Sequence, residues 1–163
     1  MSSPRWPMSE PALLQMLAYR VADQVLLTGV SHIAEIIELP LCTSLPGCKK
    51  WFRGLASSRG NIIPVSDLGG FLFGSNCIED GHSRLIVINR DEEVYALLVN
   101  EIIGLKKYST SHLLADTTDL PETLRPWALE VVHDDGAIYP VLDPDLIINS
   151  ELFLDVRRPQ VAG

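Results

Sequence analysis

Two aspartates, Asp67 and Asp143, are the residues of this sequence whose type and spacing come closest to catalytic chemistry. Each closes a copy of the pattern G-x-I-x-P-V-x-D, with GNIIPVSD over residues 60–67 and GAIYPVLD over residues 136–143. Two carboxylates from duplicated β-rich halves share one proton in aspartic proteases. The aspartates here open the tripeptides DLG and DPD, which lack the small hydroxyl residue of a protease site. An aspartyl hydrolase is therefore the alternative interpretation and not the leading one.

Other catalytic or metal-binding groups are sparse. No histidine stands at metal-site spacing from a cysteine or another histidine, the four being His32, His82, His112 and His133. The sequence contains no phosphate-binding glycine loop and no G-x-S-x-G nucleophile elbow. It therefore predicts no catalytic residue, no metal and no cofactor, and a binding module is the first expectation.

The composition of the 163-residue chain narrows the class of partner. The net charge is −8, and no block of Lys and Arg interleaves with aromatic residues, which argues against nucleic-acid binding. The apolar runs are too short to cross a bilayer, and the N-terminus lacks the apolar segment of a secretory signal. Three cysteines without framework spacing are typical of a reducing compartment. We therefore expect a cytoplasmic protein with no direct membrane insertion.

Short β-rich runs separated by turns dominate the sequence and predict small barrels or sandwiches. Strands are expected over residues 24–28, 31–37, 62–65, 85–89, 94–99, 102–105, 128–132 and 138–142. Single helical turns are expected over residues 49–52, 68–72 and 144–149. Ser9, Glu10 and Pro11 form a helix start, so a short helix is predicted over residues 12–17. The fold class is all-β with short helices: an N-terminal extension with a helix (1–17), one domain of two subdomains (18–150) and a C-terminal tail (151–163).

Local backbone structure accounts for most residues of the repeated pattern, without any catalytic role. Its two copies lie 136 − 60 = 76 residues apart. The glycine permits a turn with positive φ, the proline suits an edge or bulge, and the aspartate caps the short helix that follows. A weaker echo pairs EII at residues 35–37 with EII at residues 101–103, so an insertion separates the copies. Arg59 precedes the first copy and Asp135 the second, so the shared architecture does not account for Arg59.

A set of motifs in this order resembles the CheW-like family, the adaptor proteins of bacterial chemosensory arrays. GLASSRGNIIPVSDL at residues 54–68 resembles the family's signature of a glycine, a short strand, Arg-Gly, a hydrophobic pair, Pro-Val and Asp-Leu. IAEI at 33–36, LP at 45–46, LLVNEIIG at 97–104 and IYPVLD at 138–143 resemble its other segments. The resemblance covers roughly residues 18–149.

The resemblance implies two packed five-stranded SH3-like β-barrel subdomains and no enzymatic activity. It implies a scaffold that bridges a CheA-type histidine kinase, through the kinase's own CheW-like domain, to the cytoplasmic tip of methyl-accepting chemoreceptors. In the family, the counterparts of Glu35 and Arg59 lie together near a receptor groove between the barrels. We therefore expect a Glu35–Arg59 ion pair that orients the guanidinium and adds on the order of 1 kcal/mol or less to stability.

The expected partner-binding residues come from this groove. They comprise the ion pair, its neighbours in the turn, apolar anchors for a helical receptor hairpin, and the position where asparagine replaces the family's usual aspartate. The full set is Glu35, Arg59, Gly60, Asn61, Val30, Ile33, Leu98, Val99 and Asn100. For the four apolar residues, ordinary barrel core is the competing interpretation. An exposed barrel edge is a further expected surface for the kinase's homologous barrel.

Several departures from the family pattern point to a subgroup. Asn100 replaces aspartate, Ser57-Ser58 replaces Asn-Leu before Arg-Gly, and the sequence adds a Trp51-Phe52 pair and the N-terminal helix. These traits resemble the type IV pilus members PilI or ChpC more than the flagellar members. The resemblance therefore implies recruitment to membrane-associated receptor arrays that control twitching motility.

Overall fold

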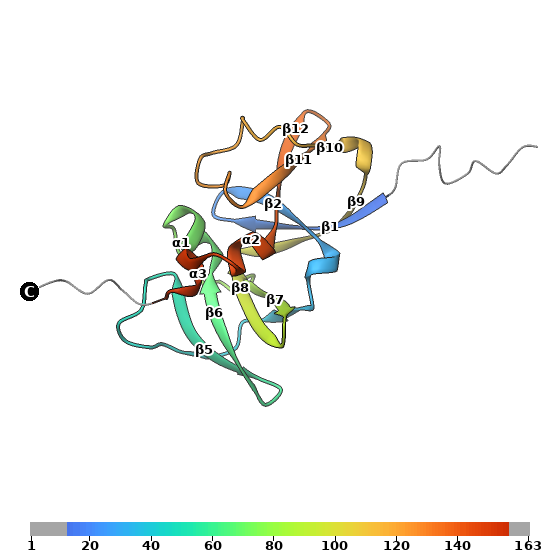
Figure 1. Ribbon diagram of the computed structural model, residues 1–163. Helices are drawn as coiled ribbons and strands as arrows, with labels where there is room; N and C mark the ends of the chain where they lie inside the picture. Colours follow the sequence, from blue (N-terminus) through green and yellow to red (C-terminus); the bar gives the residue numbers. More distant parts are fainter. Residues whose placement is uncertain (1–12, 157–163) are drawn as a thin grey trace, which may run out of the picture.

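The computed structural model describes residues 13–156, which form two twisted β-sheets with short helices between them (Figure 1). Sheet 1 has the strand order β10-β11-β12-β2-β1-β9, and sheet 2 has the order β3-β7-β8-β6-β5-β4. Each sheet has five strands of four residues or more and a two-residue strand at one edge. This architecture confirms the predicted all-β fold of two SH3-like halves.

The strands have the following bounds. Sheet 1 contains β1 (Leu13–Val21), β2 (Gln24–Gly29), β9 (Glu101–Ser109), β10 (Leu113–Leu114), β11 (Ala128–Asp134) and β12 (Ala137–Leu142). Sheet 2 contains β3 (Glu35–Glu38), β4 (Cys42–Thr43), β5 (Phe52–Ser58), β6 (Asn61–Asp67), β7 (Arg84–Arg90) and β8 (Glu93–Val99). The helical segments are η1 (Val30–His32), α1 (Leu68–Phe73), η2 (Thr110–His112), α2 (Pro144–Ile148) and α3 (Glu151–Leu154).

The two sheets exchange hairpins between two tandem units of the chain. The first unit runs from β1 to α1, and the second runs from β7 to α2. The β1–β2 hairpin pairs with β9 and β12 of the second unit, whereas the β7–β8 hairpin pairs with β3 and β6 of the first. Each unit therefore completes the sheet of the other, and neither assembles its sheet alone.

The registers of the two sheets correspond residue by residue. Val65 pairs with Ala96 as Val141 pairs with Leu27, which gives offsets of 141 − 65 = 76 and 96 − 27 = 69. The offset of 76 holds for all paired residues of the β5–β6 and β11–β12 hairpins, and the offset of 69 relates β1–β3 to β7–β9. The predicted repeat is thus confirmed. The predicted pairing of EII at residues 35–37 with EII at residues 101–103 was wrong in register, because 35 + 69 gives Gly104 and not Glu101 as the counterpart of Glu35.

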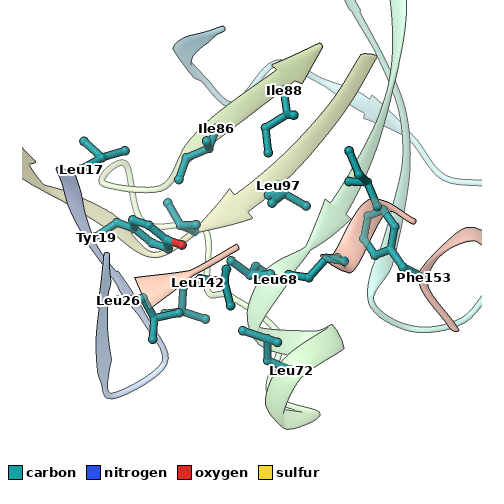
Figure 2. Close-up of a cluster of buried hydrophobic side chains, with 14 of the residues drawn as sticks. Leu17, Tyr19, Leu26, Leu68, Leu72, Ile86, Ile88, Leu97, Leu142 and Phe153 are labelled. Carbon is teal, nitrogen blue, oxygen red and sulfur yellow. The ribbon is translucent and has the colours of Figure 1, made fainter. Parts of the chain in front are cut away.

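The largest core lies where the two sheets meet (Figure 2). Leu17, Tyr19 and Leu26 from sheet 1 belong to one buried cluster with Ile86, Ile88 and Leu97 from sheet 2, and α1, α2 and α3 add Leu68, Ile147 and Phe153. Each half also has a smaller core of its own, around Ile63 and Leu85 in sheet 2 and around Leu27 and Val132 in sheet 1. Since the shared core is the largest, the relative placement of the halves is fixed by packing.

The helix predicted over residues 12–17 was wrong from Leu13 onward, where β1 begins. Residues 1–12 lie outside the described residues. Leu14 and Met16 pack on the core inside sheet 1, whereas Leu17 and Tyr19 pack on the core between the sheets, so β1 is buried on both faces. Burial on both faces produces a continuous apolar run, which periodicity does not distinguish from a helix.

Candidate functional site

Arg59 lies in the tight turn between β5 and β6. Arg59 and Gly60 both have positive φ, 53° and 80°, which is the geometry of a two-residue hairpin turn. Asp135 and Gly136 form the equivalent turn between β11 and β12, with φ of 50° and 84°. The two turns are therefore alike in backbone and differ in the side chain that each presents.

The predicted Glu35–Arg59 ion pair is present. Arg59 Nη1 lies 3.0 Å from Glu35 Oε2, and the side chains are 76% and 31% exposed. Glu35 begins β3 and pairs with Val87 of β7, so the carboxylate is held by the sheet while the guanidinium extends from the turn. An ion pair this exposed stabilises a fold by about 1 kcal/mol at most, so stability alone does not explain it.

The ion pair borders a cleft of about 260 Å³ at one end of sheet 2. Its apolar lining comes from Ile63, Val87 and Val94, and its polar lining includes Asn61 and Asn89. All the lining strands belong to sheet 2 or to the turns at its end. We call this feature the Arg59 cleft. It combines a short apolar floor with an exposed cation, a carboxylate and two amides, which suits recognition of a protein surface.

The remaining predicted contact residues do not line this cleft. Leu98 and Val99 are 0% exposed and belong to the cores, so the competing interpretation as barrel core holds for them. Asn100 braces the β1–β2 turn, because its Oδ1 accepts the Ala22 N–H at 3.0 Å. Val30 and Ile33 lie half-buried at the crossover between the sheets, and Ile33 packs on the shared core.

Asp67 and Asp143 are structural. Asp67 is 0% exposed and accepts the Gly70 and Cys77 N–H groups as well as Arg53 Nη1 at 3.1 Å. Asp143 caps α2 and accepts the Asp145 N–H at 2.9 Å. Among the described residues the two carboxylates form no hydrogen bond with each other, so the geometry lends no support to a shared catalytic proton.

One group of side chains has the composition of a metal site. His32, Asp143 and Asp145 each offer a ligand atom within 4.8 Å of the others. Arg90 already forms an ion pair with Asp145, and a guanidinium there disfavours a cation. We therefore read the group as an ion-pair network that ties η1 and β7 to α2. Sequence spacing gave no sign of it, since His32 and Asp145 come from opposite ends of the chain.

The outward face of the β5–β6 hairpin is only partly covered, and sequence reasoning did not single it out. Leu55 pairs with Pro64 on this face, beside Ile62, which is 70% exposed. Their counterparts in sheet 1, Val131 and Pro140, are buried, and Leu120 of the β10–β11 loop packs on Val131. That loop has 13 residues (115–127) and its counterpart between β4 and β5 has 8 (44–51), so it is longer by 13 − 8 = 5 residues, which explains why only one hairpin is covered. We call the uncovered surface the Ile62 face.

Comparison with known proteins agrees with this fold. The CheW-like domain model matches residues 15–152, so the chain belongs to the CheW-like domain family. The family supports a non-enzymatic adaptor role in chemosensory signalling. At 16% identity, the scaffolding protein TtCheW from Thermoanaerobacter tengcongensis has the same fold, with a TM-score of 0.71 over 81% of this chain and 90% of that one.

Three named bacterial proteins are similar to this chain in sequence. Protein PilI of Pseudomonas aeruginosa is 27% identical over 141 residues, which cover 86% of this chain and 78% of PilI. Chemotaxis protein CheW of Thermotoga maritima is 27% identical over 82% of this chain and 87% of its own length. Protein FrzA of Myxococcus xanthus is 25% identical over 61% of this chain and 62% of FrzA. Separately, the helices within residues 13–156 are all too short to span a membrane.

Proposed function

We propose that this protein is an adaptor that couples the cytoplasmic tips of methyl-accepting chemoreceptors to a CheA-type histidine kinase. The observation that carries the proposal is the Arg59 cleft. Arg59 is 76% exposed, faces Glu35, and is replaced by Asp135 in the equivalent turn of sheet 1. Membership of the CheW-like family supplies the class of partner.

The receptor tip is the partner assigned to the Arg59 cleft. A helical hairpin presents apolar side chains and charged side chains on one surface, and the cleft offers an apolar floor beside the exposed guanidinium. The Glu35 carboxylate holds the guanidinium at 3.0 Å, which limits the positions that it samples before binding. The ion pair therefore contributes orientation and selectivity, while the apolar floor contributes buried area.

The Ile62 face is the surface assigned to the kinase. Its sheet 1 counterpart is covered by the protein's own loop through Leu120, so this side of such a hairpin packs well against an apolar side chain. The kinase's regulatory domain is expected to present a homologous barrel, whose apolar edge would cover Leu55, Ile62 and Pro64. Two distinct surfaces allow one molecule to hold both partners at once.

Similarity to PilI favours a pilus-linked system, in which the adaptor would act at membrane-associated arrays that control twitching. The test is complementation of a deletion strain of the source bacterium. We expect wild-type protein to restore twitching motility and Arg59→Glu protein, at equal abundance, to fail. Restoration of flagellar swimming alone would contradict the pilus assignment.

The coupling itself is tested by reconstitution. Receptor-containing vesicles, the kinase and this protein are combined, and kinase autophosphorylation and co-sedimentation are measured. We expect Arg59→Asn and Arg59→Glu to reduce receptor-dependent kinase activity at least tenfold; asparagine tolerates the positive φ at this position, so it isolates the loss of charge. The matched control is Asp135→Asn in the equivalent turn. Equal activity of the wild-type and Arg59 variants would overturn the assignment.

A further inference from the structure

A second cavity lies at the corresponding end of sheet 1. It has a volume of about 140 Å³ and opens between β2, β9 and the β11–β12 hairpin. Ala18 and Leu27 are almost fully buried at its floor, Tyr108 and Tyr139 form walls, and Ile103 is 45% exposed at its rim. We call it the sheet 1 pocket.

The sheet 1 pocket is the internal counterpart of the Arg59 cleft. Applying the offsets of 69 and 76 to its lining residues gives Val87, Val94, Ala34, Ser58 and Ile63 for Ala18, Val25, Ile103, Asp134 and Tyr139. All five of these counterparts line the Arg59 cleft. The same structural position is therefore hollow in both halves of the molecule.

The Arg59 cleft and the sheet 1 pocket differ in the residues at their openings. Glu35 and Arg59, which face each other at the first, correspond to Gly104 and Asp135 at the second. Gly104 has no side chain, so no ion pair spans the opening of the sheet 1 pocket. The charged residues of the pocket lining are Asp134 and Lys106, and Asp135 lies in the adjacent turn. Tyr108 donates its hydroxyl to Asp134 at 3.2 Å, whereas Lys106 has no hydrogen bond or ion pair within residues 13–156.

We propose that the sheet 1 pocket is a second docking site, which takes one leucine- or phenylalanine-sized side chain of a protein partner. The partner carries a carboxylate beside that side chain, which pairs with Lys106. The size follows from the volume, because a cavity of roughly 150 Å³ accommodates a benzene-sized group and is smaller than typical small-molecule sites. Buried apolar anchors with a polar rim are the usual energetic centre of protein interfaces. The proposal rests on the adaptor function only for the existence of a protein partner.

The first test uses blocked dipeptides as probes. We expect N-acetyl-Asp-Phe-amide to shift the NMR signals of Ala18, Leu27, Ile103 and Tyr139 in a saturable way, and N-acetyl-Asp-Ser-amide to leave them unchanged. Val25→Trp, which fills the mouth from a half-buried position, should abolish the shifts. Lys106→Glu, at an exposed position where folding is not at risk, should weaken binding of N-acetyl-Asp-Phe-amide about fivefold. A third probe, N-acetyl-Lys-Phe-amide, should bind this variant more tightly than the Asp-Phe probe does. Absence of saturable shifts, or shifts only at the Arg59 cleft, would overturn the proposal.

The second test separates this site from the first. Arg59→Glu protein should bind the Asp-Phe probe as wild type does, so failure of the receptor assignment would leave this result unaffected. Val25→Trp and Lys106→Glu proteins, with Glu35 and Arg59 intact, should lose at least fivefold in retention by the reconstituted receptor–kinase assembly. Full retention of variants that no longer bind the probe would refute a docking role.

Discussion

Arg59 and Asp135 occupy equivalent positions in two hairpin turns and have nearly the same backbone, with φ of 53° and 50°. Only Arg59 faces a carboxylate, at 3.0 Å from Glu35, because the counterpart of Glu35 in the other sheet is Gly104. Because the two turns have the same backbone conformation, the turn itself does not require an arginine, and Arg59 has another role. This asymmetry is the basis for assigning Arg59 to recognition, and it also supplies matched controls for several experiments.

The two repeated aspartates should differ sharply in their contribution to stability. Asp67 is fully buried and holds two backbone N–H groups and Arg53, so Asp67→Asn removes a buried charge and weakens the pairing of Arg53. We expect a loss of about 3 kcal/mol in the free energy of unfolding. Asp143→Asn should change it by less than about 1 kcal/mol, because asparagine caps helices as well as aspartate does. Urea denaturation measures both, and equal losses would contradict the assigned roles.

Two glycines with positive φ should respond differently to alanine. A Cβ at Gly54, φ 119°, would lie 2.1 Å from the backbone oxygen of Thr43, so Gly54→Ala should prevent β4 from pairing with β5 and strongly destabilise the protein. A Cβ at Gly60, φ 80°, would meet nothing within 4 Å, so Gly60→Ala should cost only about 1–2 kcal/mol of backbone strain. Thermal unfolding ranks the two variants; a milder effect at Gly54 would contradict the close approach of β4 to β5.

Stability should fall as pH rises from about 9 to 11. Burial, reinforced by the Asp67 charge, raises the pKa of the Cys77 thiol from its ordinary value of 9.0 to about 11. Between these values the unfolded chain has lost the thiol proton while the folded protein retains it, so the free energy of unfolding decreases with pH. Denaturation under reducing conditions should show a decrease that is smaller in Cys77→Ala protein. Identical pH profiles for the two proteins would rule out this contribution.

The Ile62 face is tested by a charge at its centre. Ile62→Glu should weaken binding of the kinase's regulatory domain at least tenfold with little effect on folding, since the side chain is 70% exposed. Ile138→Glu, at the equivalent position of the other hairpin, is the matched control. Calorimetric titration with the purified kinase domain gives both affinities. A larger loss for the Ile138 variant would place the kinase surface on the other hairpin.

Local patterns predicted much of the fold and one central feature of the site. The G-x-I-x-P-V-x-D repeat correctly indicated two like halves and two helix-capping aspartates, because turn and cap chemistry is local. Pro64 lies in an interior strand, where the β8 ladder begins only at the next residue, Val65, so its missing N–H costs no bond to β8. Pro64 is therefore accommodated in an interior strand, whereas the sequence predicted an edge or a bulge.

Other features depended on tertiary context that no local pattern carries. The first strand has the apolar pattern of a short helix because both of its faces are buried. Leu98 and Val99 were candidate anchors, and only packing reveals that they are core. The Ile62 face and the sheet 1 pocket became visible only through the comparison of the two halves. The halves differ by the five-residue insertion in the β10–β11 loop and by Gly104 at the position that corresponds to Glu35.

The most direct test of the adaptor assignment is the affinity of a soluble receptor-tip fragment for wild-type, Arg59→Glu and Asp135→Arg proteins, measured by titration calorimetry. We predict that Arg59→Glu raises the dissociation constant at least tenfold, about 1.4 kcal/mol or more, while Asp135→Arg leaves it within twofold of wild type. Equal affinities for wild-type and Arg59→Glu proteins, with both folded, would contradict the claim that Arg59 is the recognition residue.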